Sequence, residues 1–111
     1  EDPRFHLIVN RVKKFKMRNT CEAISFARPN DEDVIAIVDA DDCFAHGRVL
    51  EKIARIYNEE QCWLTYGSYR SSSGAPGKSC RAYPYQTMAA NSFRREKWRA
   101  THLKTFKYKL W

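Results

Sequence analysis

The sequence predicts an α/β domain with a mainly parallel sheet, and two observations carry this prediction. The expected elements follow one another as strand, helix, strand, helix and strand, an order typical of α/β layers. Residues 34–38 form an uninterrupted apolar run, Val-Ile-Ala-Ile-Val, which is typical of a strand buried on both faces of a parallel sheet. With 111 residues and 13.1 kDa, we expect one domain spanning residues 1–111.

The individual elements follow from apolar spacing. A short apolar run predicts a strand at residues 5–9. Apolar residues then repeat at helical spacing through residues 14–27, which predicts a helix that ends before Pro29. A second apolar stripe predicts a helix at residues 47–58. Residues 61–69 are rich in aromatic and β-favouring side chains, which indicates the third strand.

The charge of the chain is unevenly distributed. The net charge is +7, and basic residues gather near both ends of the sequence, whereas residues 31–42 hold six acids and no base. An excess of positive charge alone favours nucleic acid as a partner. A phosphorylated small ligand, joined by a metal ion to the acidic segment and flanked by basic residues, explains the asymmetry better. We therefore expect no nucleic-acid partner.

Three carboxylates follow the apolar run directly: Asp39, Asp41 and Asp42. Carboxylates gathered at a strand end are costly unless something positive compensates them. If the strand continues, alternate residues point the same way, so Asp39 and Asp41 face one ligand while Asp42 turns away and caps the next helix. Such a pair can hold Mg²⁺ or Mn²⁺ and leave positions for phosphate oxygens. The pattern predicts a metal site at Asp39 and Asp41.

Several segments together resemble family 2 glycosyltransferases of the GT-A fold. The similarity covers about residues 10–111 with consistent order and spacing. It is carried by Asn-Thr-Cys-Glu-Ala-Ile at 19–24, Asp-Ala-Asp-Asp at 39–42 with Val-Leu-Glu at 49–51, Trp-Leu-Thr-Tyr-Gly-Ser-Tyr at 63–69, and Thr-His-Leu-Lys-Thr-Phe at 101–106.

The resemblance implies an inverting glycosyltransferase of the hexosyltransferase type. It would transfer a sugar from a nucleotide-diphosphate donor, expected to be a UDP-sugar, to a hydroxyl of a sugar, lipid or protein acceptor. In the family the first aspartate contacts the donor's ribose or the metal, and the last binds the metal, which assigns Asp39 and Asp41 with Mn²⁺ or Mg²⁺. Family position adds Asn19 and Lys13 as donor-binding candidates. The remaining candidates for the substrate or diphosphate are His102, Arg99 and Lys104, against the alternatives of a structural histidine and a solvated basic face.

The resemblance also implies a partial three-layer sandwich, Rossmann-like, that lacks most of the N-terminal nucleotide-binding unit. The general base of the family lies C-terminal to these segments, so we expect it beyond Trp111. Where family members often have Gly between the aspartates and Trp-Leu after them, this chain has Ala40 and Cys43-Phe44, which changes the donor pocket. Two alternatives stay open: a non-catalytic relic of the fold, inactive as a fragment, and a basic nucleic-acid-binding module.

No apolar stretch reaches the length of a membrane span, and the N-terminus has no signal-peptide pattern. We therefore expect no membrane span in this chain and a cytoplasmic location.

Overall fold

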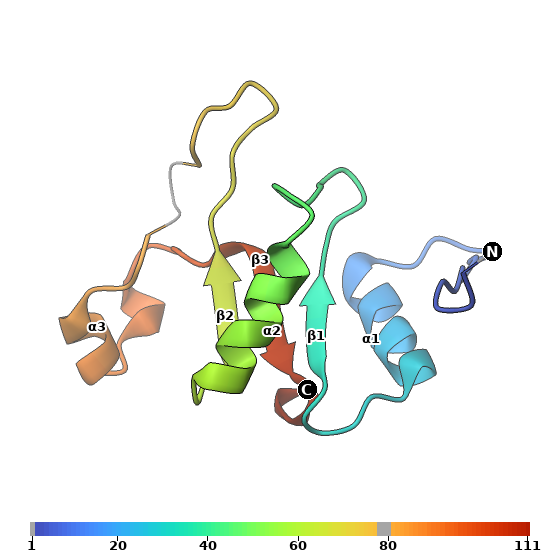
Figure 1. Ribbon diagram of the computed structural model, residues 1–111, viewed down its shortest axis with the longest axis horizontal. Coiled ribbons are helices and arrows are strands. Elements are labelled where there is room, and N and C mark those ends of the chain that lie inside the picture. Colours follow the sequence, from blue (N-terminus) through green and yellow to red (C-terminus); the bar gives the residue numbers. More distant parts are fainter. Residues whose placement is uncertain (1, 78–80) are drawn as a thin grey trace.

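A three-stranded sheet forms the centre of the computed structural model, which describes residues 2–77 and 81–111 (Figure 1). The strands are β1 (Val34–Ile37), β2 (Leu64–Gly67) and β3 (Thr101–Lys107), in the spatial order β1-β3-β2. The central strand β3 pairs antiparallel with both neighbours. β1 and β2 therefore run in the same direction but do not pair with each other.

The predicted mainly parallel sheet of a GT-A, Rossmann-like sandwich is wrong, because both strand pairings are antiparallel. The strands predicted within residues 34–38 and 61–69 are present as β1 and β2. However, β3 inserts between them from a segment in which the apolar pattern predicts no strand. That insertion replaces the expected parallel pairing with two antiparallel ones.

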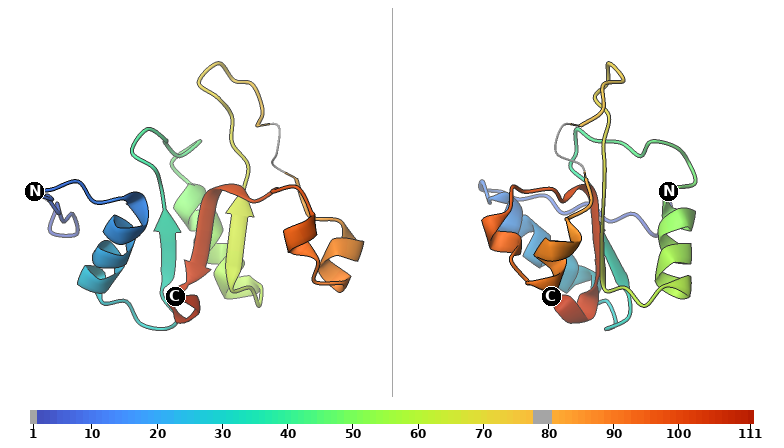
Figure 2. Two further views of the ribbon diagram at one scale, coloured as in Figure 1. Left: turned by 180° about the vertical axis from the view of Figure 1, so that it is seen from behind. Right: turned by 90° about the vertical axis from the view of Figure 1, so that its left-hand side faces the viewer.

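The helices predicted at residues 14–27 and 47–58 are confirmed as α1 (Lys16–Ala27) and α2 (Val49–Glu59). A short helix α3 (Tyr85–Ala89) and two 3₁₀ turns, Phe93–Arg95 and Tyr108–Leu110, complete the described elements. α2 lies on one side of the sheet, and α1 and α3 lie on the other (Figure 2). None of the helices within the described ranges has the length and apolarity needed to span a bilayer.

The predicted strand at residues 5–9 is wrong. These residues belong to no helix or strand. Among the described residues, the backbone N–H and C=O groups of residues 6–9 form no backbone–backbone hydrogen bond. The apolar run therefore lacks the strand partner that its composition would need.

β1 is not buried on both faces, contrary to the prediction from its apolar run. Its residues alternate between exposed and half-buried, and the side chain of Val34 is 36% exposed. β1 is an edge strand in the described sheet, so its outer side is uncovered. The two faces of β1 are also covered only in part, since Val34 and Ala36 line an open pocket beside α2 and stay exposed.

The best-buried contact of the sheet is polar. Thr105 in β3 is fully buried, and its hydroxyl lies 3.0 Å from the Tyr57 hydroxyl of α2 and 2.7 Å from the Thr65 hydroxyl of β2. These three hydroxyls join α2 to the two strands. Ile24 of α1 is the buried apolar residue among the described positions.

The chain exposes much more surface than a monomer of its mass normally does. Its accessible surface is 9972 Å², whereas a folded monomer of this mass exposes about 6,400 Å². Its radius of gyration is 15.9 Å, against about 13 Å for a compact domain of this length. The described elements therefore bury only part of the apolar surface that the chain carries.

Candidate metal site

The acidic segment after β1 forms a turn and does not continue the strand. β1 ends at Ile37, and the Asp42 N–H donates to the Asp39 carbonyl oxygen at 3.0 Å. The alternation of a strand therefore stops before the three carboxylates, and a turn of this kind brings its first and fourth residues together. This geometry places Asp42, and not Asp41, beside Asp39.

His102 joins these carboxylates from the other end of the sequence. The antiparallel register pairs Ile37 with Lys104, so the turn after β1 lies at the same end of this strand pair as the start of β3. The His102 Nδ1 lies 3.1 Å from the Asp42 Oδ2, and both side chains are about half exposed. One ligand atom each from Asp39, Asp42 and His102 lies within 4.8 Å of the others. We call these three residues the acidic–imidazole cluster.

Gly67 at the end of β2 lets the start of β3 come close. A Cβ at Gly67 would lie 2.7 Å from the backbone oxygen of His102, which is closer than such atoms approach. The Tyr69 ring, two residues on, meets the His102 ring edge-to-face with centroids 6.0 Å apart. β2 therefore helps to hold His102 in place.

Asp39 is paired with a lysine from α1. The Lys16 Nζ donates to both Asp39 carboxylate oxygens, at 2.6 Å to Oδ2. Lys16 is the largest cause that lowers the pKa of Asp39, and the charges of His102 and Lys104 lower it further. Asp39 is thus held as a carboxylate, ready to act as a ligand, but with an ammonium group that a metal ion would have to displace.

The remaining predicted residues lie in other surroundings. Lys104 places its Nζ 4.9 Å from the Trp98 ring centroid, and its charge reaches Asp39. Arg99 contacts Glu96 at 3.8 Å and donates to the Ala82 carbonyl, away from the cluster.

The two donor-binding candidates near α1 are also separate from the cluster in their contacts. Lys13 lies over the Phe15 ring at 5.8 Å, and the Asn19 Oδ1 accepts from the Asn10 amide at 3.0 Å. The assignments of Lys13, Asn19, Arg99 and Lys104 to a donor site stay predictions.

Asp42 as a ligand and Lys16 as the partner of Asp39 were not predicted from the sequence. Asp42 does not cap α2, which begins at Val49 after Arg48. A turn signal for Asp42 was available in the three acids within four positions, because acidic residues favour turns over strands. Lys16 carries no such signal, since it is one of several bases between residues 11 and 18.

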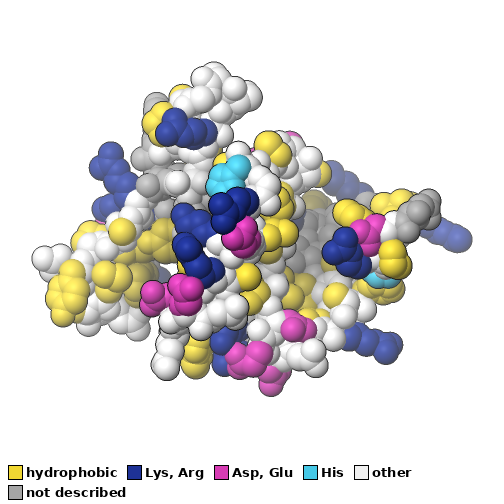
Figure 3. Space-filling model, in the orientation of Figure 1, with side chains coloured by type: hydrophobic (Ala, Val, Ile, Leu, Met, Phe, Trp, Pro, Cys, Tyr) yellow, Lys and Arg dark blue, Asp and Glu magenta, His cyan; other side chains and the backbone are white. Residues whose placement is uncertain are grey.

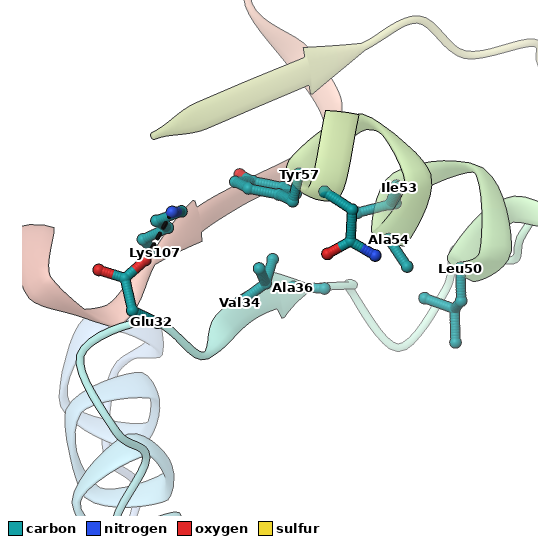
Figure 4. A pocket seen from close by; sticks show the side chains of 9 residues that line it. Glu32, Val34, Ala36, Leu50, Ile53, Ala54, Tyr57 and Lys107 are labelled. Atoms are coloured by element: carbon teal, nitrogen blue, oxygen red, sulfur yellow. Dashed lines mark hydrogen bonds and ion pairs between the residues drawn. The ribbon is translucent and has the colours of Figure 1, made fainter. Parts of the chain in front are cut away.

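A pocket lies on the side of the sheet that α2 covers. It has a volume of about 380 Å³ and opens between α2 and β1 (Figure 4). The Glu32–Lys107 ion pair, 2.6 Å long, closes one end. The apolar lining consists of Val34, Ala36, Leu50, Ile53, Ala54 and the ring of Tyr57.

Comparisons of this chain with models of protein families, with curated proteins and with solved structures found no match. The resemblance to family 2 glycosyltransferases therefore stays a prediction that depends on the motifs alone.

Proposed function

We propose that this chain binds the diphosphate of a nucleotide sugar through a divalent cation held by the acidic–imidazole cluster, as part of an inverting glycosyltransferase. One observation carries the proposal: ligand atoms of Asp39, Asp42 and His102 lie within 4.8 Å of one another although α2, β2 and α3 separate His102 from the two aspartates along the chain. The motifs that resemble family 2 glycosyltransferases supply the substrate class.

The donor set of the cluster suits Mn²⁺ better than Mg²⁺. Two carboxylates and one imidazole provide both oxygen and nitrogen ligands, whereas Mg²⁺ prefers oxygen alone and retains its waters. The cluster is exposed on one side, which leaves positions for phosphate oxygens. When bound, the cation would neutralise the charge that develops on the departing nucleotide diphosphate.

Basic side chains around the cluster fit the same ligand. A cation at Asp39 would displace the Lys16 ammonium group, which is exposed and attached to a flexible stem. The freed Lys16 and the neighbouring Lys104 would then be two positive groups beside an incoming diphosphate. The site is therefore suited to exchange an internal ion pair for a metal-bound anion.

No general base is assigned among the described residues. Three of the described acids after the cluster, Glu51, Glu59 and Glu96, pair with Arg48, Arg55 and Arg99, and Glu60 is exposed at the end of α2. The hydrogen bond from Arg48 lowers the pKa of the Glu51 carboxyl, which makes Glu51 a weaker base. We propose that the base lies outside these residues, so that the isolated chain binds the donor but does not turn it over.

Calorimetric titration with UDP tests the proposal. We expect binding in the presence of Mn²⁺ and its loss when EDTA removes the metal, with circular dichroism confirming that the chain stays folded. Equal binding in both conditions would contradict metal bridging. A turnover assay with UDP-sugars on the same sample would distinguish an active domain from a relic that only binds.

A nucleic-acid-binding module is the second candidate, favoured by lysines that lie over exposed tryptophans. The Lys104 Nζ lies over Trp98, and the Lys109 Nζ lies 5.0 Å from the Trp63 centroid. Such pairs can stack on single strands. However, the face in Figure 3 shows acidic side chains among the basic ones, without one continuous basic surface. Binding of a single-stranded oligonucleotide that weakens steeply with salt, and without metal, would favour this candidate.

A further inference from the structure

The apolar segment at residues 5–9 has the pattern of a strand without a partner. Phe5, Leu7 and Val9 are 85%, 89% and 77% exposed, whereas the intervening Ile8 is 44% exposed. In a strand, the side chains of alternate residues share one face. His6, the other intervening residue, meets the Phe26 ring of α1 with centroids 5.2 Å apart. In a strand formed from this segment, Phe5, Leu7 and Val9 would therefore form an uncovered apolar row.

β1 offers an edge of matching length. The Asp33 carbonyl accepts from the Tyr108 N–H at 2.8 Å and therefore faces the β3 side. Because backbone groups alternate along a strand, those of Val34 and Ala36 point to the outer edge. Both residues also line the apolar groove between α2 and β1 (Figure 4). A strand added at this edge would find hydrogen-bond partners and an apolar surface for alternate side chains.

The two features do not meet within one copy. Residues 5–9 lie beyond α1 as seen from β1 (Figures 1 and 2), and their contacts are with α1, through His6 and through a small pocket lined by Ile8 and Ala23. The segment is thus held on the far side of a helix from the edge that it matches. A second copy has no such obstacle.

The charges flanking the two features are complementary. The apolar segment is followed by Arg11, Lys13 and Lys14, whereas Arg4 before it is paired with Asp2. β1 is preceded by acids at residues 31–33 and followed by acids at residues 39–42. A strand from the N-terminal segment would therefore bring its basic C-terminal flank to an edge with acidic ends, and like charges would disfavour two copies of β1 pairing with each other.

The exposed surface is sufficient for a stable dimer. The chain exposes 9972 Å², which exceeds the expectation for a monomer of its mass by about 3,600 Å². Permanent interfaces bury about 2,000–5,000 Å² over both partners, or about 1,000–2,500 Å² per copy. The excess exposed area of one copy is therefore larger than the area that one copy buries in such an interface.

We propose that residues 5–9 of one copy dock along the outer edge of β1 in a second copy, with Phe5, Leu7 and Val9 facing the groove beside α2. Each chain has both the segment and the edge, so the exchange is mutual and produces a symmetric dimer. This inference does not depend on the proposed function, because the docking requires neither a metal ion nor a nucleotide sugar at the acidic–imidazole cluster.

Light scattering coupled to gel filtration tests the proposal with two variants of the full chain. Leu7→Asp places a charge on the docking row, at a side chain too exposed to affect the fold of one copy. Ala36→Pro removes an N–H that faces the outer edge and so removes no hydrogen bond to β3. Tyr85→Asp, at a 76% exposed position on α3, is the matched control. Circular dichroism establishes whether each variant is folded.

We expect a mass of twice 13.1 kDa for the wild type and for Tyr85→Asp, and 13.1 kDa for each of the other variants. Mixing Leu7→Asp with Ala36→Pro should restore a one-to-one dimer, because one chain keeps the edge and the other keeps the docking row. A monomeric wild type would overturn the proposal. A dimer that the Leu7→Asp variant still forms would also overturn it. If Ala36→Pro does not fold, the comparison of the masses of Leu7→Asp and Tyr85→Asp still tests the proposal.

Discussion

The His102 Nδ1 lies 3.1 Å from the Asp42 Oδ2, although α2, β2 and α3 separate the two residues along the chain. The antiparallel insertion of β3 is responsible, because it brings the start of β3 beside the turn that follows β1. The metal site that we propose therefore depends on the element that the sequence did not predict. The predictions below test this dependence and the contacts that support it.

His102→Gln should weaken Mn²⁺ binding by at least about tenfold, because the cluster loses its nitrogen ligand. His46→Gln is the matched control, since His46 is also exposed and its Nδ1 accepts from the Arg48 N–H at 3.2 Å. Electron paramagnetic resonance of free Mn²⁺ measures both affinities. Equal affinities for the two variants would remove His102 from the site.

Gly67→Ala should weaken Mn²⁺ binding although it changes none of the three proposed ligands. The added Cβ would lie 2.7 Å from the His102 backbone oxygen, so the chain at His102 must move. Gly47→Ala is the control, because a Cβ there meets no atom within 4 Å. Mn²⁺ affinity unchanged in Gly67→Ala would show that the position of His102 is not critical to the site.

Glu32 should make the fold more stable at neutral pH than at strongly acidic pH. Ion pairs with Lys107 and Lys109, both 2.6 Å long, lower the pKa of Glu32 from 4.5 to about 2. Since the pKa is lowered in the folded state, the stabilisation is complete above pH 4.5 and is lost as the pH falls towards 2.

Thermal unfolding of the wild type and Glu32→Gln across this pH range measures the effect. The difference in Tm should be largest near neutral pH and should vanish near pH 2. Glu60→Gln, at an exposed position after α2, is the control and should show no such trend. A Tm difference independent of pH would contradict the ion pairs as its cause.

Thr105→Val should destabilise the fold by about 1–3 kcal/mol, because the fully buried hydroxyl is the shared partner of the Tyr57 and Thr65 hydroxyls. Tyr57→Phe removes one of these two hydrogen bonds and should destabilise less, by about 0.5–1.5 kcal/mol. Denaturant unfolding measures both free energies. A larger effect for Tyr57→Phe than for Thr105→Val would contradict the central role of Thr105.

Apolar spacing predicted the elements whose stability depends on local pattern. α1, α2, β1 and β2 each lie within or close to the predicted ranges. β3 was not predicted, because its alternating sequence includes His102, Lys104 and a threonine that is buried by hydroxyl contacts instead of apolar ones. Strand order was not predictable from local pattern either, since it depends on pairing between residues that are distant in sequence.

The candidate site was predicted in part for a similar reason. The acidic segment and its place after β1 were visible in the sequence, and so was His102 as a motif residue. Which aspartates share a side depends on whether the strand continues through them. The hydrogen bond from the Asp42 N–H to the Asp39 carbonyl decides this geometry, and no single residue type signals it.

A comparison of Mn²⁺ binding by Asp42→Asn and Asp41→Asn tests the central claim most directly. The two variants remove the same charge one residue apart, so they separate the cluster of Asp39, Asp42 and His102 from the Asp39–Asp41 pair expected from strand alternation. We predict that Asp42→Asn loses the Mn²⁺ affinity of the wild type by at least about tenfold and that Asp41→Asn retains it. The opposite result, or equal Mn²⁺ binding by both variants and the wild type, would contradict the site proposed for this chain.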